Sequence, residues 1–193
     1  WGEQDICTRP TRKGDRFFIA AIIIASMFMR LIFFSLTLYV ISFVGFAQSA
    51  VPTPESVIGF KPGTDYKLMD YEDLSKYFRQ LAASTQRMKL LEVGKTSEGR
   101  PHLLALISSE ENLRNIDKWQ DINRKMALGL ATTAEAEEFA RTGKVFVWID
   151  SSMHATEVAP AQHSPDLAFK LITEETEETR RIRDKVILVQ VPC

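Results

Sequence analysis

Two short apolar runs with a helical pattern between them constrain the fold more than any other feature of this chain. Residues 145–149 (VFVWI) and 186–191 (VILVQV) have the length of strands and carry no charge. Between residues 158 and 172, apolar side chains recur at helical spacing. Continuous apolar strands joined through a helix are typical of a parallel sheet that is covered on both faces. The sequence therefore predicts an α/β fold around a right-handed strand–helix–strand crossover.

A helix and a hairpin are predicted before this crossover. Asp70 precedes apolar residues at helical spacing, which predicts a capped helix that extends to residue 81. Two strand-like segments, 90–93 and 103–107, are separated by residues 94–101, which are rich in turn formers. This arrangement predicts two antiparallel strands joined by a tight connection.

The remaining segments predict helices and one irregular stretch. Residues 110–130 predict one polar helix, and Thr133 predicts the cap of a shorter helix that follows. Residues 51–67 hold three prolines and two glycines, which predicts an irregular lead-in. Pro165 predicts a kink or a restart in the crossover helix, because proline donates no backbone hydrogen bond. The charged residues 174–183 predict a helix exposed to solvent.

The composition narrows the classes of function. A length of 193 residues suits one ordinary domain, and 45% hydrophobic with 25% charged residues is a globular balance. The formal net charge of −1 gives no indication of a nucleic-acid partner. The two cysteines, Cys7 and Cys193, stand at the two ends of the chain. The body therefore has no internal disulfide framework.

The amino-terminal part differs from the rest, since Arg30 is the only charged residue between positions 17 and 47. A start at Met29 gives a short basic region, an apolar stretch, and small residues at Gly45 and Ala47. This is the pattern of a secretory signal peptide. An apolar run of this length also has the properties of a membrane anchor. We therefore expect upstream or non-native residues at 1–28, a signal peptide or membrane anchor at 29–50, and an exported domain at 51–193.

His154 and Glu157 are the candidate metal ligands. They follow the strand at 145–149, and the carboxyl ends of strands are where open α/β sheets place ligands. Zinc takes imidazole nitrogen and carboxylate oxygen, and two donors three residues apart can reach one ion. The alternative is structural: His154 holds the loop and Glu157 caps the next helix, where the helix dipole favours a carboxylate.

Other polar residues are weighed against structural roles. Asp150 is predicted to orient His154, as carboxylates often do for metal-bound histidines, or to cap the strand end. His163 is expected on a helix surface, with a role as a further ligand as the alternative. His102 is expected to be structural, and Arg100 is expected to hold the hairpin turn.

Three segments together resemble the zinc metallocarboxypeptidases of the carboxypeptidase A superfamily. These are the turn at 93–101 (VGKTSEGRP), the strand that leads to residues 154–157 (HATE), and the strand end at 189–193 (VQVPC). They occur in the family's order and cover residues 51–193. The resemblance implies a three-layer α/β/α fold with a mixed, mainly parallel sheet, incomplete in this chain.

The resemblance also implies a function. It implies Zn²⁺ as cofactor, His154 and Glu157 as two of its ligands, and a peptide or protein as substrate. The family's third ligand, its catalytic glutamate and its substrate-binding arginines would lie past Cys193, so no catalytic residue is assigned. We therefore expect an exported metallocarboxypeptidase, of which residues 51–193 alone bind zinc weakly and show no turnover.

The sequence departs from the family's pattern at two places. Digestive members carry arginine where this chain has Thr156, and a glycine pair often precedes the histidine where this chain has Ser151 and Ser152. Two other functions stay open. The same fold hosts zinc amide hydrolases that act on N-acyl amino acids, and an exported non-catalytic homologue would keep the fold without the activity.

Overall fold

The computed structural model describes residues 29–30, 50–154 and 156–193. The chain divides into two compact units, residues 1–48 and 49–193, and the second is described below. Of the predicted signal or anchor segment, only Met29, Arg30 and Ala50 are among the described residues, and the predicted segment 1–28 lies outside them. Within the part of the chain described here, no helix has the length and apolar character needed to cross a membrane.

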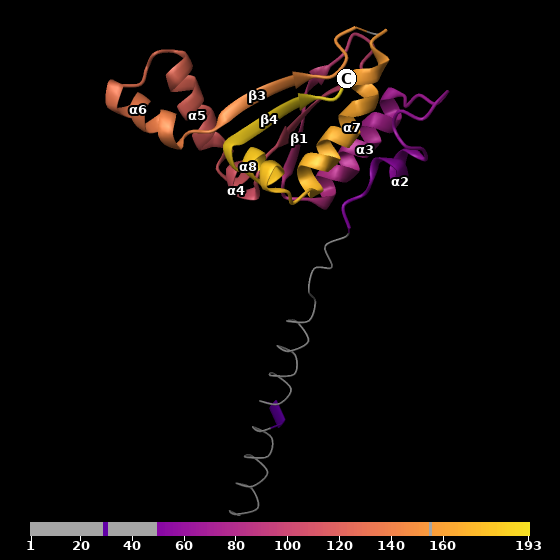
Figure 1. Ribbon diagram of the computed structural model, residues 1–193, viewed down its shortest axis with the longest axis horizontal. Coiled ribbons are helices and arrows are strands. Elements are labelled where there is room, and N and C mark those ends of the chain that lie inside the picture. Colours follow the sequence, from indigo (N-terminus) through magenta and orange to yellow (C-terminus); the bar gives the residue numbers. More distant parts are fainter. Residues whose placement is uncertain (1–28, 31–49, 155) are drawn as a thin grey trace, which may run out of the picture. The chain divides into compact units, whose positions relative to one another are not determined.

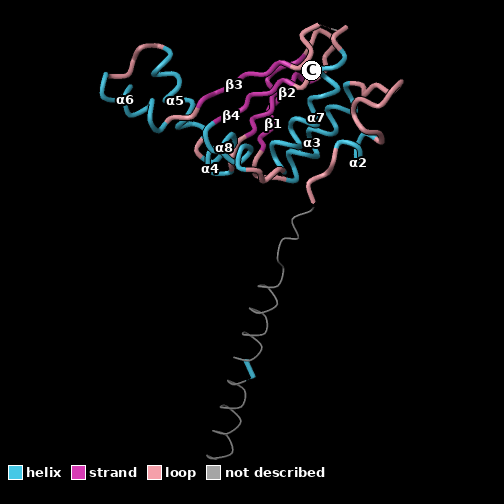
Figure 2. Tube along the Cα trace, in the orientation of Figure 1, coloured by secondary structure: helices cyan, strands magenta, loops and turns pink. Residues whose placement is uncertain are grey.

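A four-stranded mixed sheet forms the centre of the second unit (Figures 1 and 2). Its strands are β1 (Met88–Lys95), β2 (Pro101–Ile107), β3 (Val145–Asp150) and β4 (Val186–Val191), in the order β1-β2-β4-β3. β3 and β4 run parallel, whereas the pairs β1–β2 and β2–β4 are antiparallel. The mixed α/β sheet is confirmed. The expected parallel majority is not reached among the four described strands, because the β1–β2 hairpin contributes antiparallel pairings.

Three helices cover one face of the sheet: α2 (Pro54–Ile58), α3 (Tyr71–Ser84) and α7 (Val158–Thr173). The Asp70 cap is confirmed, since its carboxylate accepts a hydrogen bond from the Asp73 amide at 2.8 Å. The expected irregular lead-in is partly wrong, because Pro54 occupies the first turn of α2, where its missing amide costs nothing. The core of this layer joins Leu74, Phe78, Leu81, Ala105, Ile172 and Leu188.

Helices on the opposite face complete the three layers. The apolar side chains of α4 (Glu110–Arg114) and α5 (Ile116–Ala127) pack with Leu106, Ile187 and Val189 of the sheet. The single helix expected at 110–130 is divided at Asn115, whose amide and side-chain nitrogens both donate to the Glu111 carbonyl. α6 (Thr133–Thr142) follows, and its cap is Thr132 rather than Thr133, because Thr132 and Glu135 form a reciprocal capping box.

The crossover helix α7 runs through Pro165 as one helix, without the predicted restart. Pro165 lacks the amide that would bond to the carbonyl four residues earlier, that of Ala161. The Ser164 hydroxyl donates to this carbonyl instead, at 3.0 Å. The local substitution of a hydroxyl for an amide therefore keeps the helix continuous.

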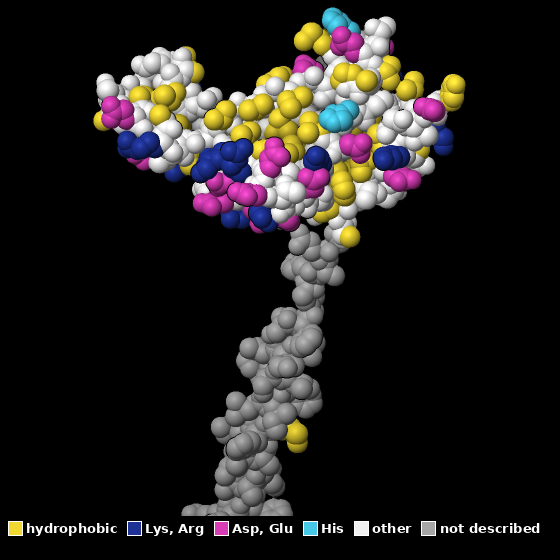
Figure 3. Space-filling model, in the orientation of Figure 1, with side chains coloured by type: hydrophobic (Ala, Val, Ile, Leu, Met, Phe, Trp, Pro, Cys, Tyr) yellow, Lys and Arg dark blue, Asp and Glu magenta, His cyan; other side chains and the backbone are white. Residues whose placement is uncertain are grey.

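Among the described strands, β3 lies at an edge of the sheet, whereas the sequence predicts a strand covered on both faces. β4 confirms the expectation for a strand covered on both faces, but the side chains of Val145 and Trp148 on β3 are 61% and 62% exposed. Figure 3 shows apolar side chains gathered over this part of the molecule. An apolar strand is usually covered by neighbouring elements on both faces. Among the described strands, however, only β4 pairs with β3.

Candidate metal centre

The predicted loop lies at the carboxyl edge of the sheet. β3 ends at Asp150 and α7 begins at Val158, so residues 151–157 connect the strand to the crossover helix (Figure 1). The Ser151 amide donates to the Val191 carbonyl at the end of β4, at 3.0 Å. This bond continues the parallel β3–β4 pairing by one residue and fixes where the loop leaves the sheet.

His154 and Glu157 are the first and last residues of one hydrogen-bonded turn. The Glu157 amide donates to the His154 carbonyl at 2.9 Å, and the His154 amide donates to Glu157 Oε2 at 3.2 Å. Ser152 closes the same loop, since its hydroxyl lies 2.8 Å from the Glu157 carbonyl oxygen. The two predicted ligands are thereby held together by one backbone bond and by one bond from the His154 amide to the Glu157 carboxylate.

Both candidate ligands are exposed, and their free donor atoms remain available. Within the described residues, the His154 ring nitrogens and Glu157 Oε1 make no hydrogen bond. Glu157 occupies the N-cap position of α7, yet its carboxylate makes no capping bond to the helix. Glu157 therefore stands at the helix start that the structural alternative gives it, but its carboxylate accepts from the His154 amide instead of capping the helix.

Asp150 is the last residue of β3, and its charge affects Cys193, which follows the end of β4. Within the described residues its carboxylate makes no hydrogen bond to His154, so its orienting role stays a prediction. Burial raises the pKa of the Cys193 thiol, and the negative charge of Asp150 raises this pKa further. Asp150 thus places a negative charge at the same edge of the sheet as the candidate ligands.

The other two histidines lie elsewhere. His163 is exposed on α7, as expected for a histidine on a helix surface. His102 is exposed on β2, and its structural role stays a prediction. Among the residues that the structure describes, no group of three or more histidine, cysteine, aspartate or glutamate side chains is arranged to hold a metal ion. The described residues therefore supply a pair of candidate donors rather than a complete coordination shell.

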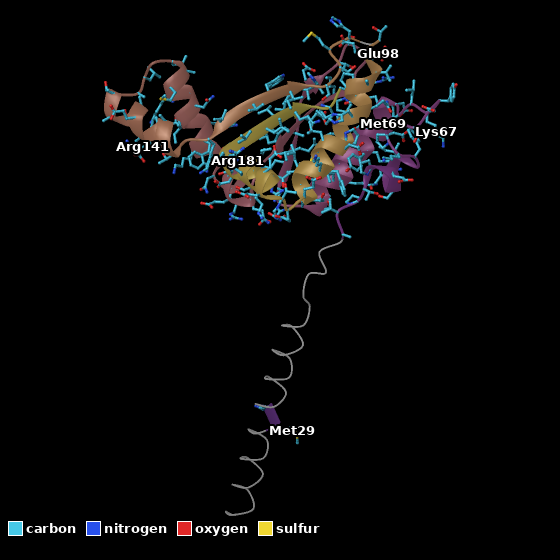
Figure 4. The ribbon with its side chains drawn as sticks, in the orientation of Figure 1. Met29, Lys67, Met69, Glu98, Arg141 and Arg181 are labelled. Carbon is cyan, nitrogen blue, oxygen red and sulfur yellow. The ribbon has the colours of Figure 1, made fainter. Side chains whose placement is uncertain are left out.

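Arg100 holds the hairpin turn, as expected. Its guanidinium lies 3.6 Å from the Glu98 carboxylate, which Figure 4 labels at this turn, and 5.9 Å from the centre of the Tyr71 ring. The Tyr71 hydroxyl donates to the Pro101 carbonyl, which joins the start of α3 to the start of β2. Burial raises the pKa of this tyrosine, so it remains a neutral hydrogen-bond donor at physiological pH.

Residues 74–193 match the family described as zinc carboxypeptidase. The chain belongs to the zinc carboxypeptidase family. The match begins inside α3 and includes the sheet, the crossover and the loop with both candidate ligands. Family membership implies zinc, while the ligand assignment rests on the loop geometry described above.

The chain is also similar to a solved structure, a carboxypeptidase A from Helicoverpa armigera. The identity is 17% and the TM-score is 0.45, and the similarity covers 72% of this chain. The chain spans only 29% of the length of that protein. No curated protein sequence matches the chain.

Sequence reasoning missed one residue that fixes the position of α7. The buried Gln162 side chain donates to the Met69 carbonyl and accepts from the Met69 amide, both at 3.0 Å. This paired bond ties the first turns of α7 to the residue just before the α3 cap, and Figure 4 labels Met69 there. This contact could not be predicted from a local sequence pattern, because the two residues lie 93 positions apart.

Proposed function

We propose that this chain carries part of the metal site of an exported zinc metallocarboxypeptidase that hydrolyses carboxyl-terminal peptide bonds. The observation that carries the proposal is the hydrogen-bonded turn of His154 and Glu157 in a chain of the zinc carboxypeptidase family. The turn stands at the carboxyl edge of a βαβ crossover, where α/β proteins bind their ligands.

The donor set fits zinc. Catalytic zinc sites commonly combine imidazole nitrogen and carboxylate oxygen from three protein side chains with one water. His154 supplies the nitrogen and Glu157 supplies the oxygen. The His154 amide donates to Oε2 of Glu157, which leaves Oε1 as the oxygen for the metal. We propose that further donors come from outside the described residues.

The residues of the loop bind and orient in this proposal. The hydrogen bond from the His154 amide restrains the Glu157 side chain. Less conformational entropy is then lost when this side chain binds an ion. The bond from Ser151 to Val191 fixes the loop to the sheet, so the two donors keep a constant position. When bound, zinc lowers the pKa of a coordinated water to about 7, which gives a nucleophile at neutral pH.

The proposed substrate is a peptide or protein, and the proposed location is outside the cytoplasm. The first follows from the family, and the second follows from the apolar segment at 29–50 that resembles a signal peptide or membrane anchor. Expression with a reporter fused after residue 193 tests export. Reporter activity outside the cytoplasm that requires residues 29–50 supports the proposal, whereas retention in the cytoplasm contradicts it.

Zinc titration of the full chain tests the ligand assignment. We expect weak binding, since the described residues supply two protein donors, and we expect His154→Ala and Glu157→Gln each to weaken it at least tenfold. His163→Ala is the matched control, because it removes an exposed imidazole on α7 and should leave the affinity unchanged. An unchanged affinity in His154→Ala would overturn the assignment.

Substrate choice tests the reaction. Using the complete gene product, we expect release of carboxyl-terminal residues from peptides, and loss of this activity in His154→Ala. Hydrolysis of N-acyl amino acids without peptide cleavage would instead support the amide-hydrolase alternative. No turnover with either substrate, despite bound zinc, would support a non-catalytic homologue.

A further inference from the structure

Ser152 has an unusual backbone conformation beside the candidate ligands. Its φ angle is +85°, in a region that favours glycine and that other L-residues occupy at a cost. Only one other non-glycine residue in the described part of the chain, Tyr66, has a positive φ. A serine held in such a conformation needs a compensating interaction, and the position of its hydroxyl shows what that interaction is.

The Ser152 hydroxyl contacts the carbonyl oxygens at both ends of the His154–Glu157 turn. It is 2.8 Å from the Glu157 carbonyl oxygen and 3.2 Å from the His154 carbonyl oxygen. A hydroxyl carries one proton, so the donated bond is shared between the two carbonyls, with the shorter contact to Glu157. A single side chain therefore contacts the backbone of both candidate ligands.

We propose that Ser152 is a positioning residue that presets the His154–Glu157 pair for metal binding. This inference rests on the proposed function, because it assigns to Ser152 a part in the same site. The hydroxyl holds the two carbonyls at a fixed separation, which holds the two backbones from which the donors extend. Glycine suits the same backbone angle but has no hydroxyl, so this chain adds a constraint that glycine cannot supply.

Loss of the hydroxyl should weaken zinc binding without unfolding the domain. For Ser152→Ala in the full chain we expect a two- to tenfold weaker affinity for Zn²⁺, the effect of losing one supporting hydrogen bond. Ser152→Gly also relieves the strained φ angle, so it should be at least as stable as Ser152→Ala and still bind zinc more weakly than the wild type. The thermal midpoint should change little, because Ser152 belongs to neither of the two apolar cores.

Ser84→Ala is the matched control. It also deletes one hydroxyl that donates to a backbone carbonyl, that of Leu81 at 2.8 Å, but at the end of α3. Its zinc affinity should equal that of the wild type. A Ser152→Gly variant with wild-type affinity would overturn the inference, since it would show that the backbone angle and not the hydroxyl matters.

A metal-free measurement separates this inference from the proposed function. Amide hydrogen exchange of Glu157, whose N–H bonds to the His154 carbonyl, should become two- to tenfold faster in Ser152→Ala. Unchanged exchange would overturn the inference even if His154→Ala abolishes zinc binding. If His154→Ala leaves zinc binding unchanged while Ser152→Ala speeds exchange, the ligand assignment fails. Ser152 would then stabilise the loop without any part in metal binding.

Discussion

Arg183 offers the sharpest test of how α7 is held in place. It belongs to α8 (Glu177–Lys185), and its side chain is only 5% exposed. The guanidinium donates to the Leu171 carbonyl at 2.8 Å, to the Glu174 carbonyl at 2.6 Å and to Glu175 Oε2 at 2.8 Å. Helix ends leave carbonyls without partners, and here one buried arginine satisfies two of them.

The magnitude follows from what Arg183→Met leaves behind. Methionine keeps much of the packed stem but donates nothing, so the buried Leu171 carbonyl loses its partner. The Glu174 carbonyl still accepts from the Thr179 hydroxyl at 2.9 Å, so its loss is smaller. Hydrogen bonds from a charged donor contribute about 1.5–3 kcal/mol each. Relief of the desolvation that lowers the pKa of Arg183 offsets part of this loss. We therefore expect the free energy of unfolding to fall by about 3 kcal/mol.

Urea unfolding followed by far-ultraviolet circular dichroism measures this change. Arg181→Met is the matched control, because Arg181 is exposed on the same helix and carries the same charge. The control should stay within about 0.5 kcal/mol of the wild type. A loss below about 1 kcal/mol in Arg183→Met would refute the reasoning, since it would show that the desolvation of the guanidinium cancels its hydrogen bonds.

Three further predictions use the same unfolding assay. Gln162→Leu should cost about 2–4 kcal/mol, because it leaves the amide and carbonyl of Met69 without buried partners. The Arg87 guanidinium beside Glu175 holds the pKa of that carboxyl below its usual value of 4.5. The stability difference between wild type and Glu175→Gln should be complete above pH 4.5 and disappear as the pH falls through the lowered pKa. Ser164→Ala should cost about 1 kcal/mol, and much less when Pro165→Ala restores the backbone donor.

Elements whose signals are local could be predicted from the sequence. The helix after Asp70 and the β1–β2 hairpin depend on the spacing of apolar residues and on turn formers, and both appear as expected. The βαβ crossover followed from apolar runs, and it correctly placed His154 and Glu157 at the sheet edge. Local pattern and global topology agree there, so the candidate site could be located without coordinates.

Features that depend on contacts between distant residues could not be predicted. The charge run at 174–183 indicated a solvated helix, yet Arg183 turns into the protein, because the end of α7 offers it carbonyls. β3 has the composition of a buried strand and lies at the edge of the described sheet. The left-handed conformation of Ser152 has no sequence signal, because serine seldom adopts it and the hydrogen bonds that stabilise it form only in the folded loop.

The continuity of α7 connects these distant contacts to the metal site. Glu157 precedes the first turn of α7, Gln162 fixes that end to Met69, and Arg183 fixes the other end. A kink at Pro165 would uncouple the two anchored ends, because each half of the helix could then tilt independently. Since the Ser164 hydroxyl takes the place of the missing amide, both anchors act on one continuous helix. Glu157 therefore precedes a helix that is held at both ends, in addition to the hydrogen bonds of the loop itself.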